Sequence, residues 1–380
     1  MSQTKENFYI GNTQLWTLLA STIWPTIIGY GGGIMAREVS RDMWLGGILA
    51  ILTTFVLIFV LVYTGKKFPG QTIVEYSHGL VGKIPAKVLG LVLVAHFLLG
   101  ALQSIAIYVH HINDFLLTET PFIVITVVYV IVVCYLVWHG PEVIARIGVI
   151  AFIMASVFSV FVFVASLQEI NLYRVLPLFD NGFPAVVKAS LTADSFIGYN
   201  VMALSMLLPL AANQKKVGRS AALGLFIGGI IFVCYLVVEL MVMGPHVTAQ
   251  MRVACMDLVR SIQITTYLHR FESFMLALWY WSMLVQAGIL AYCAALAAQQ
   301  TLGMSGIKKL SNAAPIALGI LLISLTYLTA RNRVVFLNFI EHGWKEISLP
   351  VAYGLPLLLA LISLVRKPQT NQQQQKKGRR

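Results

Sequence analysis

The sequence predicts an all-α polytopic membrane protein of about ten transmembrane helices, in which the first and sixth helices are broken near the middle of the membrane. Of its 380 residues, 58% are hydrophobic and 11% are charged, and the mean hydropathy of +0.80 lies far above that of a soluble domain. Apolar windows of about 20 residues, the length that crosses the hydrocarbon core, recur along nearly the whole chain. Glycine-containing motifs fall within two of these windows.

Hydropathy places ten spans in one transmembrane domain over residues 1–365, and the fourth span lies at the short end of the range. The approximate ranges are 16–35, 43–64, 88–112, 122–138, 147–167, 192–212, 221–243, 271–298, 313–328 and 349–365. Residues 366–380 hold a Gln tract flanked by basic residues and nothing apolar to bury. We expect this tail to be disordered beside the anionic inner leaflet, with a specific tail partner as the alternative.

The basic residues indicate how the chain is oriented. With a cytoplasmic N-terminus, the larger share of Lys and Arg falls on the inner side, for example at Lys66, Lys67, Lys215 and Lys216. The positive-inside rule therefore predicts that both termini are cytoplasmic. The net charge of +12 lies in short loops and in the tail, so a basic face for nucleic acid is not expected.

Enzyme and cofactor signatures are absent from the sequence. It contains no G-x-x-x-x-G-K-[ST], G-x-S-x-G or H-E-x-x-H pattern, and its four cysteines show no C-x-x-C spacing. His110, His111 and Asp114 look like metal ligands, but adjacent histidines on a helix face different directions. We therefore expect neither an enzyme nor a bound metal or other cofactor.

The first span contains the segment Gly29-Tyr30-Gly31-Gly32-Gly33. Each glycine costs about 1 kcal/mol relative to Ala in a helix interior, so a continuous helix is not expected here. The favoured interpretation is an unwound segment whose free N–H and C=O groups face a cavity and bind a ligand. A close-packed helix interface of the G-x-x-x-G kind, through Gly29 and Gly33, is the alternative.

The sixth span repeats this motif: Ile197-Gly198-Tyr199-Asn200 matches Ile28-Gly29-Tyr30 at an offset close to half the chain. Because five spans separate the two copies, the two halves insert with opposite orientations. This pattern predicts a 5+5 inverted repeat, with the first repeat at about 12–168 and the second at about 183–365. The two broken helices would then meet at mid-membrane.

A site between two broken helices offers N–H groups for a carboxylate and free carbonyls for an ammonium group, which suits a zwitterionic amino acid. Uncharged polar residues within apolar spans add candidates: Gln103 in the third span and Gln286 in the eighth. His96 is better explained as an interhelical hydrogen-bond partner. The predicted substrate-binding residues are Gly29, Tyr30, Gly31, Gly32, Gly33, Gln103, Phe196, Gly198, Tyr199, Asn200 and Gln286.

Two acidic residues in the spans are candidates for gating or coupling. Glu239 in the seventh span would cost about 2.5–3.5 kcal/mol if charged at the helix centre, so it should be protonated or face the bundle interior. A hydrogen bond to a neighbouring helix, or a place nearer the outer interface, would also explain it. Asp194 precedes the predicted break in the sixth span, where helix capping and gating are equally consistent with its position.

Several short motifs in a fixed order give the chain a family resemblance. They are Ser40-Arg41-Asp42-Met43-Trp44-Leu45; Phe68-Pro69-Gly70-Gln71-Thr72; Leu176-Pro177 with Asp194-Ser195-Phe196; Leu208-Pro209 with Lys215-Lys216-Val217; Arg270-Phe271-Glu272; and Leu349-Pro350 with Tyr353-Gly354-Leu355-Pro356. In these segments the chain resembles the endospore germination permeases, the B subunits of nutrient germinant receptors (GerAB and GerKB type). They belong to the amino acid–polyamine–organocation transporter superfamily.

The resemblance implies a LeuT-like inverted repeat, a location in the spore inner membrane, and assembly with an A subunit and a lipoprotein C subunit. It also implies that the chain binds a small germinant, often an amino acid, and triggers spore germination. Two alternatives remain: a proton- or sodium-coupled amino acid transporter, and a scaffold that binds no ligand. Asn200 departs from the family pattern, which often has a glutamate near this position, so a charged partner for the ligand is not expected there.

Overall fold

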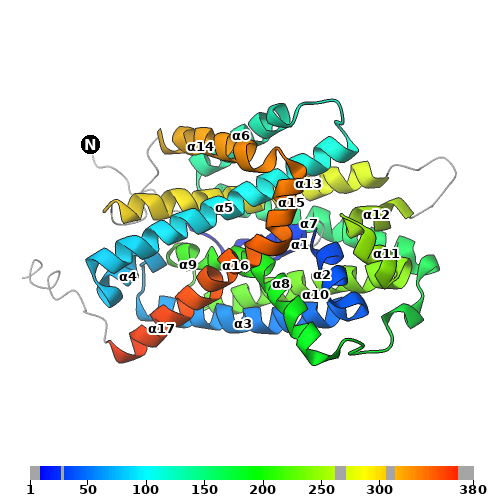
Figure 1. Ribbon diagram of the computed structural model, residues 1–380. Helices are drawn as coiled ribbons and strands as arrows, with labels where there is room; N and C mark the ends of the chain where they lie inside the picture. The colour runs from blue at the N-terminus through cyan, green and yellow to red at the C-terminus, as the bar shows by residue number, and fades with distance from the viewer. Residues whose placement is uncertain (1–8, 27–29, 262–270, 305–312, 367–380) are drawn as a thin grey trace, which may run out of the picture.

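The structure is a computed structural model that describes residues 9–26, 30–261, 271–304 and 313–366. Within these residues the chain forms a bundle of long helices that run roughly side by side (Figure 1), and its only β-bridge joins Ile10 and Ala211. We call the two ends of the bundle the α4 end and the α11 end, after the short helices found there. Gly29 and residues 367–380 of the expected tail lie outside the described residues.

The described part of the first half contains seven α-helices. They are α1 (Asn12–Thr26), α2 (Gly32–Val39), α3 (Met43–Lys67), α4 (Ile73–Val81), α5 (Lys83–Phe115), α6 (Phe122–His139) and α7 (Pro141–Ser166). Helix α4 begins at a capping box, in which the Thr72 hydroxyl accepts from the Glu75 N–H and the Glu75 carboxylate accepts from the Thr72 N–H. It lies between the second and third spans.

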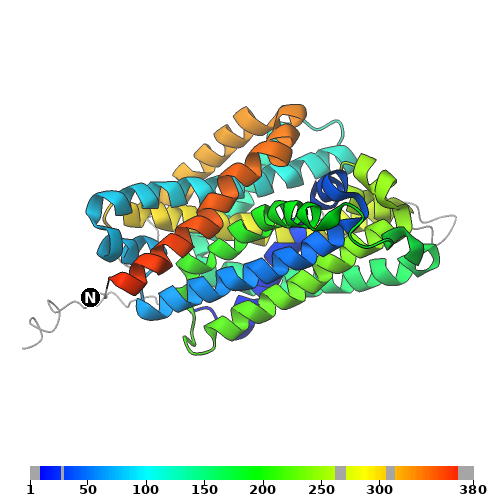
Figure 2. The same cartoon turned by 60° about the horizontal axis from the view of Figure 1, so that its bottom comes forward.

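The second half contains the remaining helices. They are α8 (Gly182–Met202), α9 (Leu204–Leu207), α10 (Val217–Met243), α11 (Pro245–Gln250), α12 (Ala254–Ser261), α13 (Phe271–Thr301), α14 (Ala313–Ala330), α15 (Arg333–Asn338), α16 (Trp344–Leu349) and α17 (Leu355–Val365). Helices α15 to α17 form one span, joined by the π-helical turns Phe339–Gly343 and Pro350–Gly354. This span, orange to red in Figure 2, crosses the bundle obliquely, and α17 contacts α3.

Nine stretches in the described part of the chain are long and apolar enough to cross a membrane. The first predicted span accounts for a tenth through the 15 residues of α1; its second part, the 8 residues of α2, is continuous with α3 in the stretch Gly32–Lys67. The last span starts at Arg333, well before the predicted 349, because hydropathy does not detect its polar first half. That half carries Glu341 and Lys345, which form ion pairs with α2.

Neither predicted break is found at the motif glycines that the structure describes. Gly31 keeps helical dihedral angles, with φ −61° and ψ −45°. In the sixth span, α8 continues unbroken through Gly198 and ends at Met202; the Ala203 N–H then bonds to the Asn200 carbonyl at 3.2 Å, a tighter turn than in an α-helix. The prediction that this helix breaks at Ile197-Gly198-Tyr199-Asn200 is therefore wrong by a few residues.

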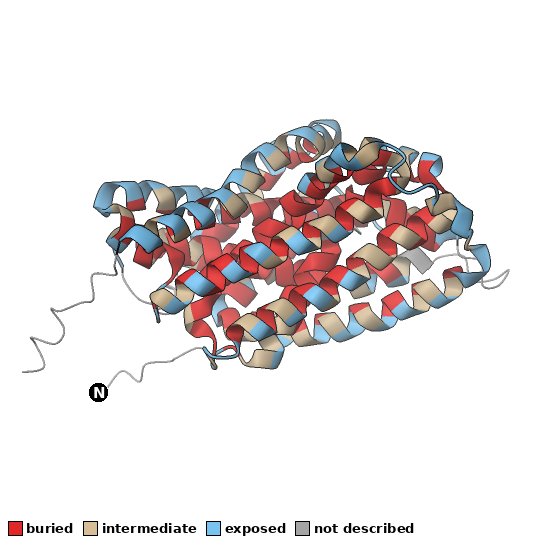
Figure 3. Cartoon of the chain, turned by 90° about the horizontal axis from the view of Figure 1, so that it is seen from below, coloured by how far each residue is buried: buried red, intermediate tan, exposed pale blue. Residues whose placement is uncertain are grey.

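Burial identifies the centre of the bundle. In their apolar windows, the stretches that include α8 and α13 are 94% and 83% buried, whereas those that include α7 and α14 are each 33% buried. The outward faces of the peripheral helices carry exposed apolar side chains such as Phe59 and Leu328, which suit contact with lipid (Figure 3). A site enclosed by the protein must therefore lie around α8 and α13.

The interrupted helices are joined at the α4 end. The Ile10 N–H donates to the Leu210 carbonyl at 2.9 Å, and the Ala212 N–H donates to the Ile10 carbonyl at 3.0 Å. The start of the first span is thus paired with the end of the sixth, the two helices that correspond in a 5+5 inverted repeat.

Candidate functional site

A buried polar cluster joins three of the central spans, and Gln286 of α13 is at its centre. The Gln286 side-chain amide donates to the Tyr199 hydroxyl at 2.6 Å and to Asn200 Oδ1 at 3.0 Å, both on α8, and lies 3.5 Å from the backbone carbonyl of Thr22 on α1. All three side chains are at most 2% exposed. We call Gln286, Tyr199, Asn200 and the Thr22 carbonyl the Gln286 cluster.

Gln103 of α5 adds a polar group for which the described residues provide no partner. Its side chain is 1% exposed, and neither its amide nitrogen nor its amide oxygen makes a hydrogen bond to any residue that the structure describes. One turn earlier on α5, a Cβ at Gly100 would lie 2.8 Å from the Tyr199 ring, so this face of α5 packs on the Gln286 cluster. An unpaired buried polar group costs about 1–3 kcal/mol, so a ligand that hydrogen-bonds to Gln103 would recover this cost.

The candidate site is electrically neutral. Gln286, Tyr199, Asn200 and Gln103 offer amide and hydroxyl groups, which both donate and accept hydrogen bonds. A ligand with net charge would gain no opposite charge from these side chains on leaving water. The arrangement therefore suits a small molecule whose net charge is zero and which presents both donors and acceptors.

The predicted glycines have different roles from those expected. A Cβ at Gly32 would lie 2.1 Å from Glu239 Oε2, and one at Gly33 would lie 2.5 Å from the Met251 backbone oxygen. Real Cβ atoms do not approach other atoms so closely, so both glycines permit close packing of α2 on its neighbours. For these residues the structure favours the small-residue interface over the unwound segment.

The other candidates near the interruptions are also packed. Tyr30 is 4% exposed, and its ring centroid lies 5.3 Å from that of His111 on α5. Phe196 is buried in the apolar core. Gly198 faces the last span, where a Cβ would lie 2.4 Å from the Tyr353 ring. Of the predicted site residues, the structure thus joins Tyr199, Asn200 and Gln286 directly.

Glu239 is fully buried, and neither of its carboxylate oxygens makes a hydrogen bond within the described part of the chain. Its position four residues before the end of α10 is nearer to the α11 end than to the middle. The predicted hydrogen bond from Glu239 to a neighbouring helix is therefore not found among the described residues. The alternative explanation, a position near the end of the span, agrees with the structure. Asp194 lies in the interior of α8, which begins at Gly182, so its proposed capping role is wrong.

The candidate metal ligands at the end of α5 each have protein partners. His110 Nε2 lies 2.9 Å from the Ala330 carbonyl, His111 Nδ1 lies 2.7 Å from the Ile107 carbonyl, and Asp114 pairs with Arg333. In the described ranges, no three His, Cys, Asp or Glu side chains form a group that could hold a metal ion.

An ion-pair clasp, which sequence reasoning missed, closes the α11 end. Glu38 of α2 pairs with Lys345 of α16 at 3.1 Å and accepts from the Thr192 hydroxyl of α8 at 2.7 Å. Arg37 of α2 pairs with Glu341 of the last span. Charges near span ends are common, so the sequence alone does not distinguish this clasp from ordinary solvated residues.

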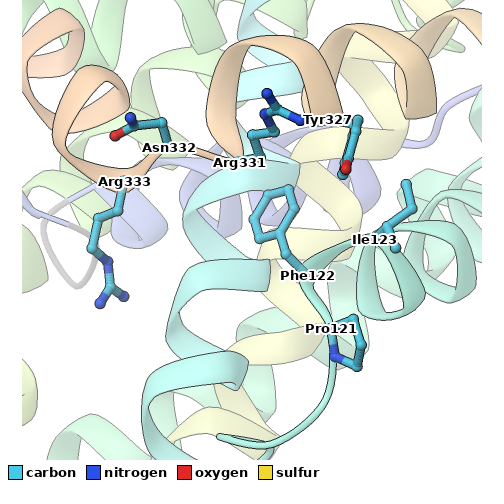
Figure 4. A pocket seen from close by; sticks show the side chains of 7 residues that line it. All are labelled: Pro121, Phe122, Ile123, Tyr327, Arg331, Asn332 and Arg333. Carbon is cyan, nitrogen blue, oxygen red and sulfur yellow. The ribbon is translucent and has the colours of Figure 1, made fainter.

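Three cavities lie away from the Gln286 cluster. One of them, of about 590 Å³, opens at the α11 end between α6 and the α14–α15 turn; there Arg331 stacks on Tyr327 above Phe122 (Figure 4). A second, of about 360 Å³, is an apolar slot between α6 and α14. The third, beside Trp24, measures about 10 Å³. Since the cluster's side chains are buried, this conformation is closed around them.

Solved structures show the fold. Mhp1, a nucleobase-cation-symport-1 family transporter in a closed conformation, aligns with a TM-score of 0.60 at 15% identity over 96% of this chain and 95% of that chain. A Na⁺-coupled sialic acid symporter gives 0.60 at 12% identity, covering 97% and 82%. MhsT in complex with L-phenylalanine gives 0.52 at 13% identity, covering 93% and 97%. The predicted LeuT-like fold is confirmed.

Sequence comparison identifies relatives over the same length. Spore germination protein YndE of Bacillus subtilis (strain 168) is 25% identical over 345 residues, 88% of this chain and 90% of the relative. Spore germination protein KB of the same organism is 22% identical over 344 residues, 86% and 88% respectively. A family model described as "Spore germination protein" matches residues 9–334. Since this match spans nine of the ten spans, the chain belongs to the spore germination protein family.

Proposed function

We propose that this chain is the B subunit of a nutrient germinant receptor, which binds a small zwitterionic germinant, an amino acid, at the Gln286 cluster. The observation that carries the proposal is the buried, neutral cluster that joins α1, α8 and α13 beside the unpaired amide of Gln103. An amino acid supplies the donor and the acceptor that Gln103 lacks, and its carboxylate and ammonium charges offset each other, so the site needs no counter-charge. MhsT, one of the structural neighbours, was solved with L-phenylalanine.

Signalling would follow from movement of the interrupted helices. A ligand that binds more tightly to one arrangement of α1 and α8 than to another shifts the population between them. The clasp from Glu38 to Lys345 is a contact that such a shift would break or remake. The proposed receivers of the signal are an A subunit and a C lipoprotein subunit, in the spore inner membrane, with the α4 end facing the cytoplasm.

The first experiment measures ligand binding by the purified chain in detergent. A panel of amino acids, sugars and nucleosides is screened for an increase in melting temperature. A neutral amino acid should raise the melting temperature of the parent, and Gln286→Ala should abolish that increase. Gln299→Ala, the same change nearer the end of α13, should retain it. A ligand response that persists in Gln286→Ala would reject the proposed site.

A coupled amino acid transporter is the second candidate. Two structural neighbours favour it, because one is a nucleobase-cation-symport-1 family transporter and the other is a Na⁺-coupled sialic acid symporter. Proteoliposomes that contain only this chain distinguish the two functions. Concentrative uptake of the amino acid found in the screen would establish a transporter. Saturable binding without uptake, together with loss of germination in Gln286→Ala spores, would establish a receptor subunit.

A further inference from the structure

A second polar cluster, apart from the Gln286 cluster, joins the second, sixth and last spans around Asp194. Asp194 of α8 is 3% exposed. The Thr53 hydroxyl of α3 lies 2.7 and 2.8 Å from its two carboxylate oxygens, and the Tyr353 hydroxyl lies 2.7 Å from Oδ1. The Thr54 hydroxyl lies 3.3 Å from Oδ1 and 2.9 Å from the Tyr353 hydroxyl. We call these four side chains the Asp194 cluster.

The Asp194 cluster contains a carboxylate but no basic side chain. Its contacts are Thr53, Thr54 and Tyr353, none of which carries a positive charge. The ion pairs found in the described ranges lie elsewhere, such as that of Glu38 with Lys345. A buried charge needs a counter-charge because water no longer solvates it. The cluster is therefore short of positive charge.

The number of hydroxyl protons in the Asp194 cluster also indicates a shortage of positive charge. The three hydroxyl groups carry one proton each, yet their oxygens make eight contacts with other oxygens. Five join the members of the cluster to one another, and the others are Thr53 with the Leu49 and Ala50 carbonyls, at 3.2 and 2.8 Å, and Thr54 with the Ala50 carbonyl, at 2.7 Å. One proton bridges one such contact well. Of the five contacts within the cluster, at least two therefore have no proton of their own, and a further positive charge among these oxygens would stabilise them.

We propose that the Asp194 cluster binds one Na⁺ ion between the second, sixth and last spans. The available ligand atoms are carboxylate and hydroxyl oxygens, the donors that hard cations prefer. An added proton would bridge only two of these oxygens, whereas a metal cation contacts several at once. A single carboxylate matches the charge of a monovalent ion better than that of Ca²⁺, whose sites are built from several carboxylates.

The surrounding structure holds the ligand atoms in place. Tyr353 lies in the π-helical turn Pro350–Gly354, and such turns are frequent at functional sites. The absence of a side chain at Gly198 lets the Tyr353 ring reach α8. The Trp344 indole N–H and the Ser348 hydroxyl both donate to the Ser195 carbonyl, at 2.9 and 2.7 Å, and anchor the last span beside Asp194.

The position also links the ion to the ligand. Tyr199 and Asn200 of the Gln286 cluster follow Asp194 by less than two turns on the same helix. An ion that fixes α8 against α3 and the last span would fix the Gln286 cluster as well, so Na⁺ should strengthen germinant binding. This link depends on the proposed function, but the Na⁺ site itself does not.

The test measures binding of ²²Na⁺ to the purified full chain by scintillation proximity, at constant ionic strength with choline chloride. The parent should bind ²²Na⁺ saturably, and Asp194→Asn should weaken binding at least tenfold. Thr53→Val and Tyr353→Phe remove one ligand oxygen each, keep the carboxylate and should weaken binding several-fold. Glu142→Gln changes a carboxylate on α7, outside both polar clusters, and should bind as the parent does. Monodispersity and circular dichroism verify that each variant is folded.

Three results would overturn the proposal. They are the absence of saturable ²²Na⁺ binding by the parent, equal binding by the parent and both Thr53→Val and Tyr353→Phe, and a melting temperature that responds to pH through Asp194 but not to Na⁺. The last result would make Asp194 a proton site instead. If Asp194→Asn does not fold, the other two variants decide the outcome. Failure of the amino acid screen would leave ²²Na⁺ binding unaffected, so the two proposals fail separately.

Discussion

Gly198 is the position where the close approach of the last span to α8 can be tested most directly. Replacing it by Ala puts a methyl carbon 2.4 Å from Tyr353 Cε2 and 3.1 Å from Cζ. The ring is partly buried and packs against the core, so the added methyl must push it out of its present position. The expected response is displacement of Tyr353, with loss of its 2.7 Å hydrogen bond to Asp194.

The magnitude follows from three opposing contributions. Ala gains about 1 kcal/mol over Gly in helix propensity. Overpacking costs about 1–3 kcal/mol, and losing a hydrogen bond to a charged group costs about 1.5–3 kcal/mol. The net expectation is a loss of about 1.5–5 kcal/mol in the free energy of unfolding, since both costs together exceed the gain.

The assay is unfolding of the purified chain in mixed micelles by a denaturing detergent. Gly79→Ala, in the interior of α4 with nothing within 4 Å of the added carbon, is the matched control and should be stabilised by up to about 1 kcal/mol. In a Tyr353→Ala background the clash is gone, so Gly198→Ala should no longer destabilise. If Gly198→Ala stabilises the parent as much as Gly79→Ala does, the reasoning is refuted.

Three further predictions concern buried polar groups and the clasp. Gln103→Leu should raise the melting temperature, because it removes an unpaired amide worth about 1–3 kcal/mol, and should weaken amino acid binding; a lower melting temperature would show that the amide is satisfied. Gly32→Ala should destabilise the parent through its contact with Glu239, and Glu239→Ala should relieve the loss; independent effects of the two changes would contradict the contact. Lys345→Glu should increase cysteine labelling at the α11 end, and Glu38→Lys in the same chain should restore protection; no rescue would argue against the clasp.

The number and order of the spans could be predicted from the sequence because lipid requires each helix to be apolar over a fixed length. Gln103 and Gln286 could be predicted as candidate site residues because an amide in an apolar span must find a partner. The start of the last span could not be predicted from the sequence. Glu341 and Lys345 lower the hydropathy of its first half, although both form ion pairs with α2.

Gly198 shows why the local structure of the site was harder to predict. The low helix propensity of glycine suggests a break at Gly198. However, the glycine is needed because the ring of Tyr353, more than 150 residues later, packs against it, and a single sequence gives no indication of that contact. The Thr22 carbonyl was missed for another reason. Every residue has a backbone carbonyl, so only the three-dimensional position reveals that this one lies beside Gln286.

The pairing of Ile10 with Leu210 and Ala212 has a mechanical consequence. Two backbone hydrogen bonds fasten the leading end of one inverted repeat to the equivalent helix of the other. If the bundle rocks about its centre, these two ends move together unless both hydrogen bonds break. The residues just before α1 then take part in the conformational change, and a rigid domain fused directly ahead of Ile10 would hinder that movement.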